Sequence, residues 1–85
     1  MHNSMKNLDK YNQIFVSTLG ASESDLNEAY TFANVAEWDS LAHMQLIGEL
    51  EDAFDLLFET EEILKFGSYE NGKCILERYG VSFGG

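Results

Sequence analysis

Apolar residues recur with a helical period near the start of the chain. Between positions 5 and 19 they follow one another at spacings of three, one or four residues, which places them on one face of a helix. The members of this face are Leu8, Tyr11, Ile14, Phe15 and Leu19. Gly20 comes directly afterwards and predicts a C-cap. We therefore expect an amphipathic helix over residues 5–19.

The strongest helical pattern lies over residues 40–55, with Asp39 or Ser40 as its N-cap. At about 100° per residue, one broad arc collects the residues that we expect to face the core. These are His43, Met44, Leu46, Ile47, Leu50, Ala53 and Phe54. The opposite side, which we expect to face water or a partner, carries Leu41, Gln45, Gly48, Glu49, Asp52 and Asp55, with Glu51 at its border.

Two shorter helical patterns follow. Thr60 is a candidate N-cap with two acids behind it, and Gly67 is the expected end of this short helix. Ser68 opens the last helix and Gly80 stops it. Gly72 falls in the middle of this last helix, where it costs about 1 kcal/mol relative to Ala.

The segment between the first two helices, residues 21–37, is polar and irregular. We expect an ordered loop with one short helical turn, held by its apolar residues: Leu26, Tyr30, Phe32 and Val35. Neither a β-hairpin dipeptide nor a sustained alternation occurs. The prediction is an all-α fold, an antiparallel bundle of three main helices plus one short helix. It forms a single domain over 1–85, with a core from about residue 5 to 81 and short flexible termini.

Length and charge narrow the function. A chain of 85 residues makes one domain and buries too little surface for an enclosed active site. Its net charge is −10, from 15 acidic and 5 basic side chains, and no Lys or Arg occurs between Tyr11 and Leu64. Such a chain repels nucleic acid and anionic membranes, so we expect partners that present Lys and Arg.

Cysteine and hydropathy patterns indicate the compartment. Cys74 is the single cysteine, so no internal disulfide forms, and no Cys/His cluster has zinc spacing. No stretch reaches the roughly 18 apolar residues of a membrane span, and the first six residues lack the apolar run of a signal peptide. We expect a cytoplasmic protein without membrane insertion and without a metal site.

The candidate chemistry lies at Ser40, where a long polar loop turns into the main helix. Free amides and the positive end of the helix dipole favour an anion such as a phosphodiester there. By itself, a serine in this place is most simply a cap. A Ser40–His43 nucleophile pair is a further reading, but no third group orients the imidazole and His43 falls on the inner arc. We therefore expect a packed, hydrogen-bonded histidine and no catalytic residue.

The Asp39-Ser40-Leu41 tripeptide and the acidic helix after it resemble the phosphopantetheine attachment motif of acyl carrier proteins. The likeness continues along the helix and beyond it. It includes Leu46-Ile47, Leu50, the acid pair Glu51-Asp52, Phe54-Asp55 and the short acidic third helix. Over residues 7–81, the order and lengths of the predicted helices are similar to the family's four-helix bundle.

The resemblance implies that a separate, Mg²⁺-using phosphopantetheinyl transferase attaches 4′-phosphopantetheine from coenzyme A to Ser40. The thiol of this arm then carries an acyl group as a thioester, and the chain itself is not an enzyme. The same resemblance implies that Asp39 faces the transferase. It also implies that the second helix is the docking surface for an acyl-activating ligase, synthase or acyltransferase with basic patches, and we expect a monomer. Its docking residues are Leu41, Gln45, Glu49, Glu51, Asp52 and Asp55.

Three positions depart from the family pattern. Gln45 replaces a usual acid, Gly48 replaces a usual apolar residue, and Trp38 precedes Asp39 where fatty acid carriers have a small or leucine-like residue. They indicate a specialised polyketide, modified fatty acid or polysaccharide pathway. Two alternatives stay open: a peptidyl or aminoacyl carrier, and an acidic helical adaptor without a prosthetic group. Whether the bundle interior shelters the acyl chain also stays open.

Overall fold

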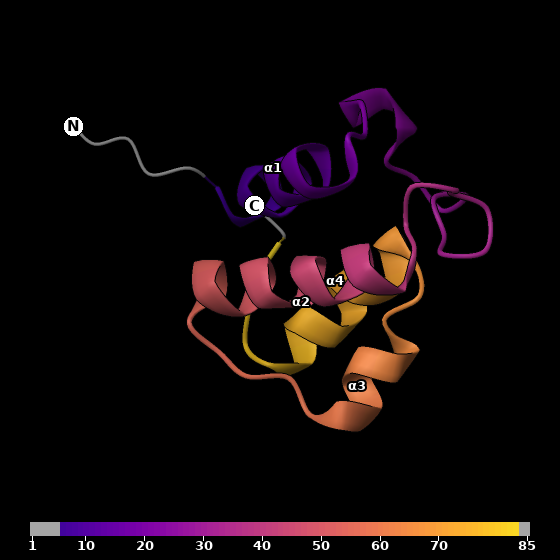
Figure 1. Ribbon diagram of the computed structural model, residues 1–85. Helices are drawn as coiled ribbons and strands as arrows, with labels where there is room; N and C mark the ends of the chain where they lie inside the picture. Colours follow the sequence, from indigo (N-terminus) through magenta and orange to yellow (C-terminus); the bar gives the residue numbers. More distant parts are fainter. Residues whose placement is uncertain (1–5, 84–85) are drawn as a thin grey trace.

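Two long helices pack against each other. In the computed structural model, which describes residues 6–83, α1 (Asn7–Leu19) packs across α2 (Ser40–Phe54), as Figure 1 shows. Gly20 adopts a left-handed conformation with φ of 72° and donates its N–H to the Val16 carbonyl, which confirms the predicted C-cap. The prediction that α1 starts at residue 5 is wrong. Lys6 is extended and acts as the N-cap, so the helix starts at residue 7.

Two short helices complete the bundle. In Figure 1, α3 (Thr60–Lys65) lies beneath the start of α2, and α4 (Tyr69–Arg78) runs behind it. The connecting loop contains one 3₁₀ turn, η1 (Glu23–Asp25), as expected. Over residues 6–83 the structure has four α-helices and no strand, which confirms the all-α prediction. Of the predicted flexible termini on either side of the core 5–81, residues 1–4 and 84–85 lie outside the described residues.

The caps of the short helices are partly as predicted. The Ser68 side chain accepts a hydrogen bond from the Asn71 amide at 2.9 Å, which confirms it as the N-cap of α4. The predicted Thr60 cap is wrong. The amides of Glu62 and Ile63 both donate to the Glu59 carbonyl, so Glu59 is the N-cap of α3, without a side-chain cap bond. The prediction that this helix ends at Gly67 is also wrong, since α3 ends two residues earlier, at Lys65.

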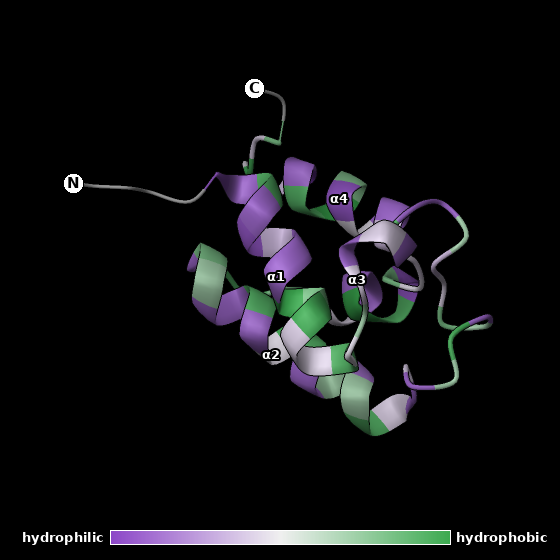
Figure 2. Ribbon diagram, turned by 90° about the horizontal axis from the view of Figure 1, so that it is seen from above, coloured by the Kyte–Doolittle hydropathy of each residue, from purple (hydrophilic) through white to green (hydrophobic). Residues whose placement is uncertain are grey.

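Aromatic rings fill the core where α1, the long loop and α4 meet. The Phe15 side chain is fully buried, and four other rings surround it with centroids 5.0 to 5.9 Å away: Tyr11, Tyr30, Trp38 and Tyr69. Edge-to-face pairs of this kind stabilise a fold by about 0.5–1.5 kcal/mol each beyond their buried area. Figure 2 shows each helix banded in green and purple, because hydrophobic positions alternate with hydrophilic ones along it.

The inner face of α2 is narrower than predicted. Leu46, Ile47 and Leu50 are buried as expected, and Ala53 and Phe54 are half-buried. The prediction that Met44 faces the core is wrong, since its side chain is 56% exposed. Met44 lies about 60° further around the helix axis than Ile47, at the edge of the arc, and therefore belongs to the outer face. Phe32, expected to be buried, is 43% exposed.

Gly72 is explained by the close approach of α1 and α4. The Tyr11 hydroxyl donates to the Tyr69 carbonyl at 2.7 Å, and burial raises the pKa of Tyr11 well above its usual value. A Cβ at position 72 would lie 2.3 Å from both the Tyr11 hydroxyl oxygen and the Phe66 ring. The helix therefore accepts the propensity cost of a mid-helix glycine because only a hydrogen fits there.

Replacing Gly72 tests this packing. We expect Gly72→Ala to lower the free energy of unfolding by about 2 kcal/mol, because overpacking exceeds the gain of about 1 kcal/mol in helix propensity. The matched control is Gly48→Ala in α2, where no atom would lie within 4 Å of the new Cβ. This control should raise stability by about 1 kcal/mol. Urea unfolding followed by circular dichroism measures both, and a stabilised Gly72→Ala variant would contradict the packing.

Candidate functional site

The candidate site lies where the long loop enters α2. Asp39 is the N-cap: its Oδ1 accepts a hydrogen bond from the Ala42 amide at 2.8 Å. Its carbonyl accepts from the His43 amide, also at 2.8 Å. Of the two N-caps that the sequence left open, the structure thus has Asp39. The side chain of Ser40, the first helical residue, takes no part in the cap.

Ser40 is exposed, and its hydroxyl forms no hydrogen bond with any residue in 6–83. The amides of Ser40 and Leu41 likewise have no partner there, since only the next two amides bond to Asp39. The helix dipole favours negative charge at this point, while the Asp39 carboxylate opposes it. A phosphodiester on the Ser40 hydroxyl therefore fits: the oxygen is accessible, two amides are available, and the nearby acid directs the charged group outward.

Trp38 holds this junction from the inside. Its side chain is 1% exposed, and its ring lies 5.6 Å from that of Phe15 and 5.8 Å from that of Tyr30. The side chain of residue 38 thus points into the core, and the side chains of the next two residues point into solvent. Because Trp38 is fixed by the core, the exposed position of Ser40 is fixed as well.

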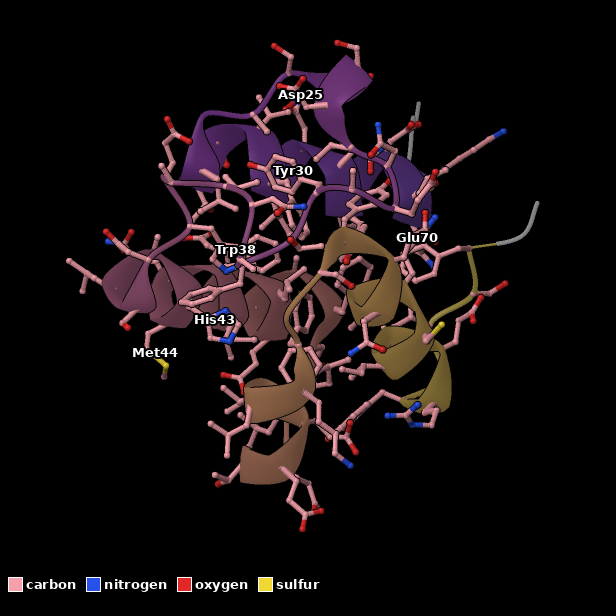
Figure 3. All side chains as sticks on the ribbon, turned by 90° about the vertical axis from the view of Figure 1, so that its right-hand side faces the viewer. Asp25, Tyr30, Trp38, His43, Met44 and Glu70 are labelled. Carbon is pink, nitrogen blue, oxygen red and sulfur yellow. The ribbon has the colours of Figure 1, made fainter. Side chains whose placement is uncertain are left out.

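His43 is hydrogen-bonded on both sides of its ring. Trp38 Nε1 donates to His43 Nδ1 at 2.9 Å, and His43 Nε2 lies 2.9 Å from the carbonyl oxygen of Ile63. The indole N–H is only a donor, so Nδ1 accepts and Nε2 carries the proton. Figure 3 shows Trp38 and His43 side by side, with Met44 pointing away from them. The prediction of a packed, hydrogen-bonded histidine is confirmed, and neither ring nitrogen is left to bond Ser40.

The predicted docking residues share the outer side of α2. All of them except Glu51 are exposed, and Leu41 is 73% exposed. The half-buried Glu51 accepts a hydrogen bond from the Phe58 amide at 2.9 Å, so it also holds the segment before α3. Asp55 caps the end of α2 in a left-handed conformation with φ of 55°. One open groove lies between this side and α1, lined by Ser17, Thr18, Gln45, Gly48, Glu49, Glu51 and Asp52.

The acids of this face keep their charge uncompensated by neighbouring bases. Within the described residues, the ion pairs join Lys73 to Glu70 and Arg78 to Glu62, both away from α2. Lys10 donates to the Ala53 carbonyl at 3.2 Å rather than to a carboxylate. The outer side of α2 is therefore a negative surface that a basic partner can bind.

Known proteins resemble about two thirds of the chain. The acyl carrier protein of Streptococcus pneumoniae serotype 4 is 40% identical over 57 residues, which are 67% of this chain and 76% of that protein. The chain belongs to the acyl carrier protein family. The acyl carrier protein of Streptococcus pyogenes serotype M1 is 41% identical over 54 residues, which are 64% of this chain and 72% of that protein. No protein-family model matches the chain.

Acyl carrier proteins carry 4′-phosphopantetheine as their prosthetic group. In this member, sequence reasoning missed exposed apolar side chains on and near α2 and α3: Phe32, Met44, Leu57 and Leu64. The only available signal was the position of Met44 at the edge of the helical arc.

None of the helices within residues 6–83 has the length and apolar character of a membrane span. The same residues contain no cluster of His, Cys, Asp and Glu suited to a metal ion.

The two residues at the junction should differ in their effect on stability. We expect Asp39→Ala to lower the free energy of unfolding by about 1 kcal/mol, because the Ala42 amide loses its cap. Ser40→Ala should change it by less than about 0.5 kcal/mol, because that side chain is exposed and unbonded. Thermal and urea unfolding of both variants measure this contrast. Equal destabilisation by the two changes would show that Ser40 is a structural cap.

Proposed function

We propose that this acyl carrier protein family member is modified with 4′-phosphopantetheine on Ser40 and carries an acyl group as a thioester between biosynthetic enzymes. One observation carries the proposal: an exposed, unbonded serine hydroxyl stands at the first residue of a helix that Asp39 already caps. The names of the relatives support the carrier role.

The loading step needs outside help. The Ser40 oxygen forms a bond to the phosphopantetheine phosphorus of coenzyme A, the nucleotide part leaves, and the hydroxyl proton must go to a base. Both ring nitrogens of His43 are already bonded to other groups, so His43 cannot take this proton. The base and the charge stabilisation therefore come from the transferase, and the chain is a substrate rather than a catalyst.

The bound arm supplies a thiol on a long flexible tether. Tethering raises the effective concentration of the cargo at each partner's active site without a new diffusional search. In the chain itself, Ser40 holds the arm and Asp39 keeps the helix start in place. A single exposed cysteine, Cys74, and a thiol cargo site both suit the reducing cytoplasm in which we place the protein.

The outer side of α2 is the proposed docking surface for the transferase and for an acyl-activating ligase, synthase or acyltransferase. Glu49, Asp52 and Asp55 attract basic patches, and Leu41 supplies an apolar contact close to the loaded serine. Attraction between exposed charges speeds encounter and is weakened by salt, which suits a monomeric carrier that must dissociate quickly. Gln45, Gly48 and Trp38 favour a specialised polyketide, modified fatty acid or polysaccharide pathway.

Loading is tested directly by mass. We expect the purified chain, incubated with coenzyme A, Mg²⁺ and a broad-specificity phosphopantetheinyl transferase, to gain the mass of one arm. Ser40→Ala should gain nothing while keeping its helical circular dichroism. Ser24→Ala, which changes another exposed serine in η1, is the matched control and should load like the unaltered chain. An unaltered chain that gains no mass, as a non-carrier adaptor would behave, contradicts the proposal.

The docking surface is tested by charge reversal. We expect Glu49→Lys combined with Asp52→Lys to raise the KM for loading about tenfold at low salt, because steering by the acidic face is lost. The difference should nearly vanish at about 1 M salt, where the Debye length is about 3 Å.

The matched control carries the same change in net charge elsewhere. Glu28→Lys combined with Glu77→Lys alters two exposed acids in the long loop and in α4. This pair should raise KM by less than about twofold, because total charge matters less than its placement. If both double variants raise KM equally, net charge and not the α2 surface governs docking.

A further inference from the structure

The short helix α3 is held by few contacts. None of its residues is buried. At its first turn, the Glu59 amide donates to the Tyr79 hydroxyl at 2.9 Å, and the exposed Arg78 pairs with Glu62 at 2.7 Å. Where α3 meets the first turn of α2, its carbonyl at Ile63 bonds to His43. Ile63 also packs against the core, and the Lys65 carbonyl accepts a hydrogen bond from Asn71 of α4. On the side of α3 next to the loading site, His43 therefore supplies the hydrogen bond that ties the helix to α2.

The bond between His43 and α3 is one of two consecutive hydrogen bonds through the imidazole, which together we call the relay. The Trp38 N–H donates to His43 Nδ1, and His43 Nε2–H donates to the Ile63 carbonyl, at 2.9 Å each. The imidazole and indole rings lie within 26° of parallel, with their centroids 6.0 Å apart. Trp38 is two residues before Ser40 and His43 three residues after it, so the relay spans the serine along the chain.

Exposed apolar side chains lie on the two elements that the relay joins. Leu41 and Met44, on α2, are 73% and 56% exposed, and Leu64, the residue after Ile63, is 79% exposed. Leu41 and Met44 are neighbours on the helix surface, since they are three residues apart. A shift of α3 would move Leu64 relative to this pair without changing either helix.

We propose that Trp38 and His43 are positioning residues that hold α3 beside Ser40, so that an enzyme docking there meets Leu41, Met44 and Leu64 as one apolar surface. The proposal deepens the proposed function and rests on it. Both ring nitrogens of His43 bond to Trp38 and Ile63 and not to Ser40, so loss of His43 should affect docking rather than the transfer step. The enzyme that fits presents apolar side chains facing this surface and basic ones toward the acids of α2.

Variants at position 43 separate the two halves of the relay. Glutamine has an amide that can replace Nε2–H toward the Ile63 carbonyl, whereas asparagine has an oxygen that can replace Nδ1 toward Trp38 but is too short for Ile63. Leucine removes both bonds and keeps much of the volume. Gln13→Ala, an exposed change on α1, is the control.

The kinetic test is the loading reaction with coenzyme A and a phosphopantetheinyl transferase. We expect His43→Leu and His43→Asn to raise KM about fivefold, the factor that corresponds to one lost hydrogen bond, with kcat unchanged. His43→Gln should restore KM to within about twofold of the unaltered chain, and Gln13→Ala should not change it. Equal KM values for all variants, or a glutamine variant as poor as the leucine one, would overturn the proposal.

The tautomer gives a signature that packing alone would not produce. Two-bond ¹H–¹⁵N spectra should show His43 protonated on Nε2 in the full chain, and a mixture of tautomers in Trp38→Phe, which keeps a ring but lacks the N–H. Amide exchange in α3 should become faster in His43→Leu while exchange in α1 stays unchanged. A proton on Nδ1 or unchanged α3 exchange contradicts the relay. An unaltered chain that fails to load, with these spectra as expected, contradicts the proposed function instead.

Discussion

The burial of Trp38 is the constraint on which the rest of the site depends. Its ring enters the aromatic core against Phe15 of α1 and Tyr30 of the long loop, and its N–H bonds to α2 through His43. The chain leaves the core immediately afterwards, so Asp39 caps the helix and Ser40 stands in solvent. The Ser40 hydroxyl is thereby exposed and yet held at a defined place by buried residues.

The fold separates an uncharged interior from a charged exterior. No Asp, Glu, Lys or Arg side chain is buried within residues 6–83. The acids of α2 therefore remain in water, and the nearby base Lys10 bonds to a backbone carbonyl instead of neutralising them. This arrangement suits a carrier that meets several enzymes in turn, because long-range attraction guides encounter while little surface must be desolvated.

Much of the fold could be predicted from local sequence. Helical periodicity and the caps at Gly20 and Ser68 depend on residues within one turn, so the pattern contains them. The start of α3 was misplaced because its cap, Glu59, acts through a backbone carbonyl that has no side-chain signature. The exposed Met44 lies at the boundary between the two faces of α2, where a helical arc alone does not decide burial.

Contacts between distant segments were beyond the sequence. Gly72 looked merely unfavourable until α4 was placed against Tyr11, 61 positions earlier in the chain. The motif around Ser40 indicated a loading site, but it gave no sign that Trp38 and His43 bond to each other or that His43 reaches Ile63. Such bonds depend on how the loop and α3 fold back onto α2.

The most direct test of whether Ser40 carries the arm is to isolate the protein from its native cells and to locate its modifications by mass spectrometry, fragmenting the undigested protein. We expect a phosphopantetheine group, free or acylated, on Ser40. A native protein that carries no such group, or carries it on another residue, would contradict the account.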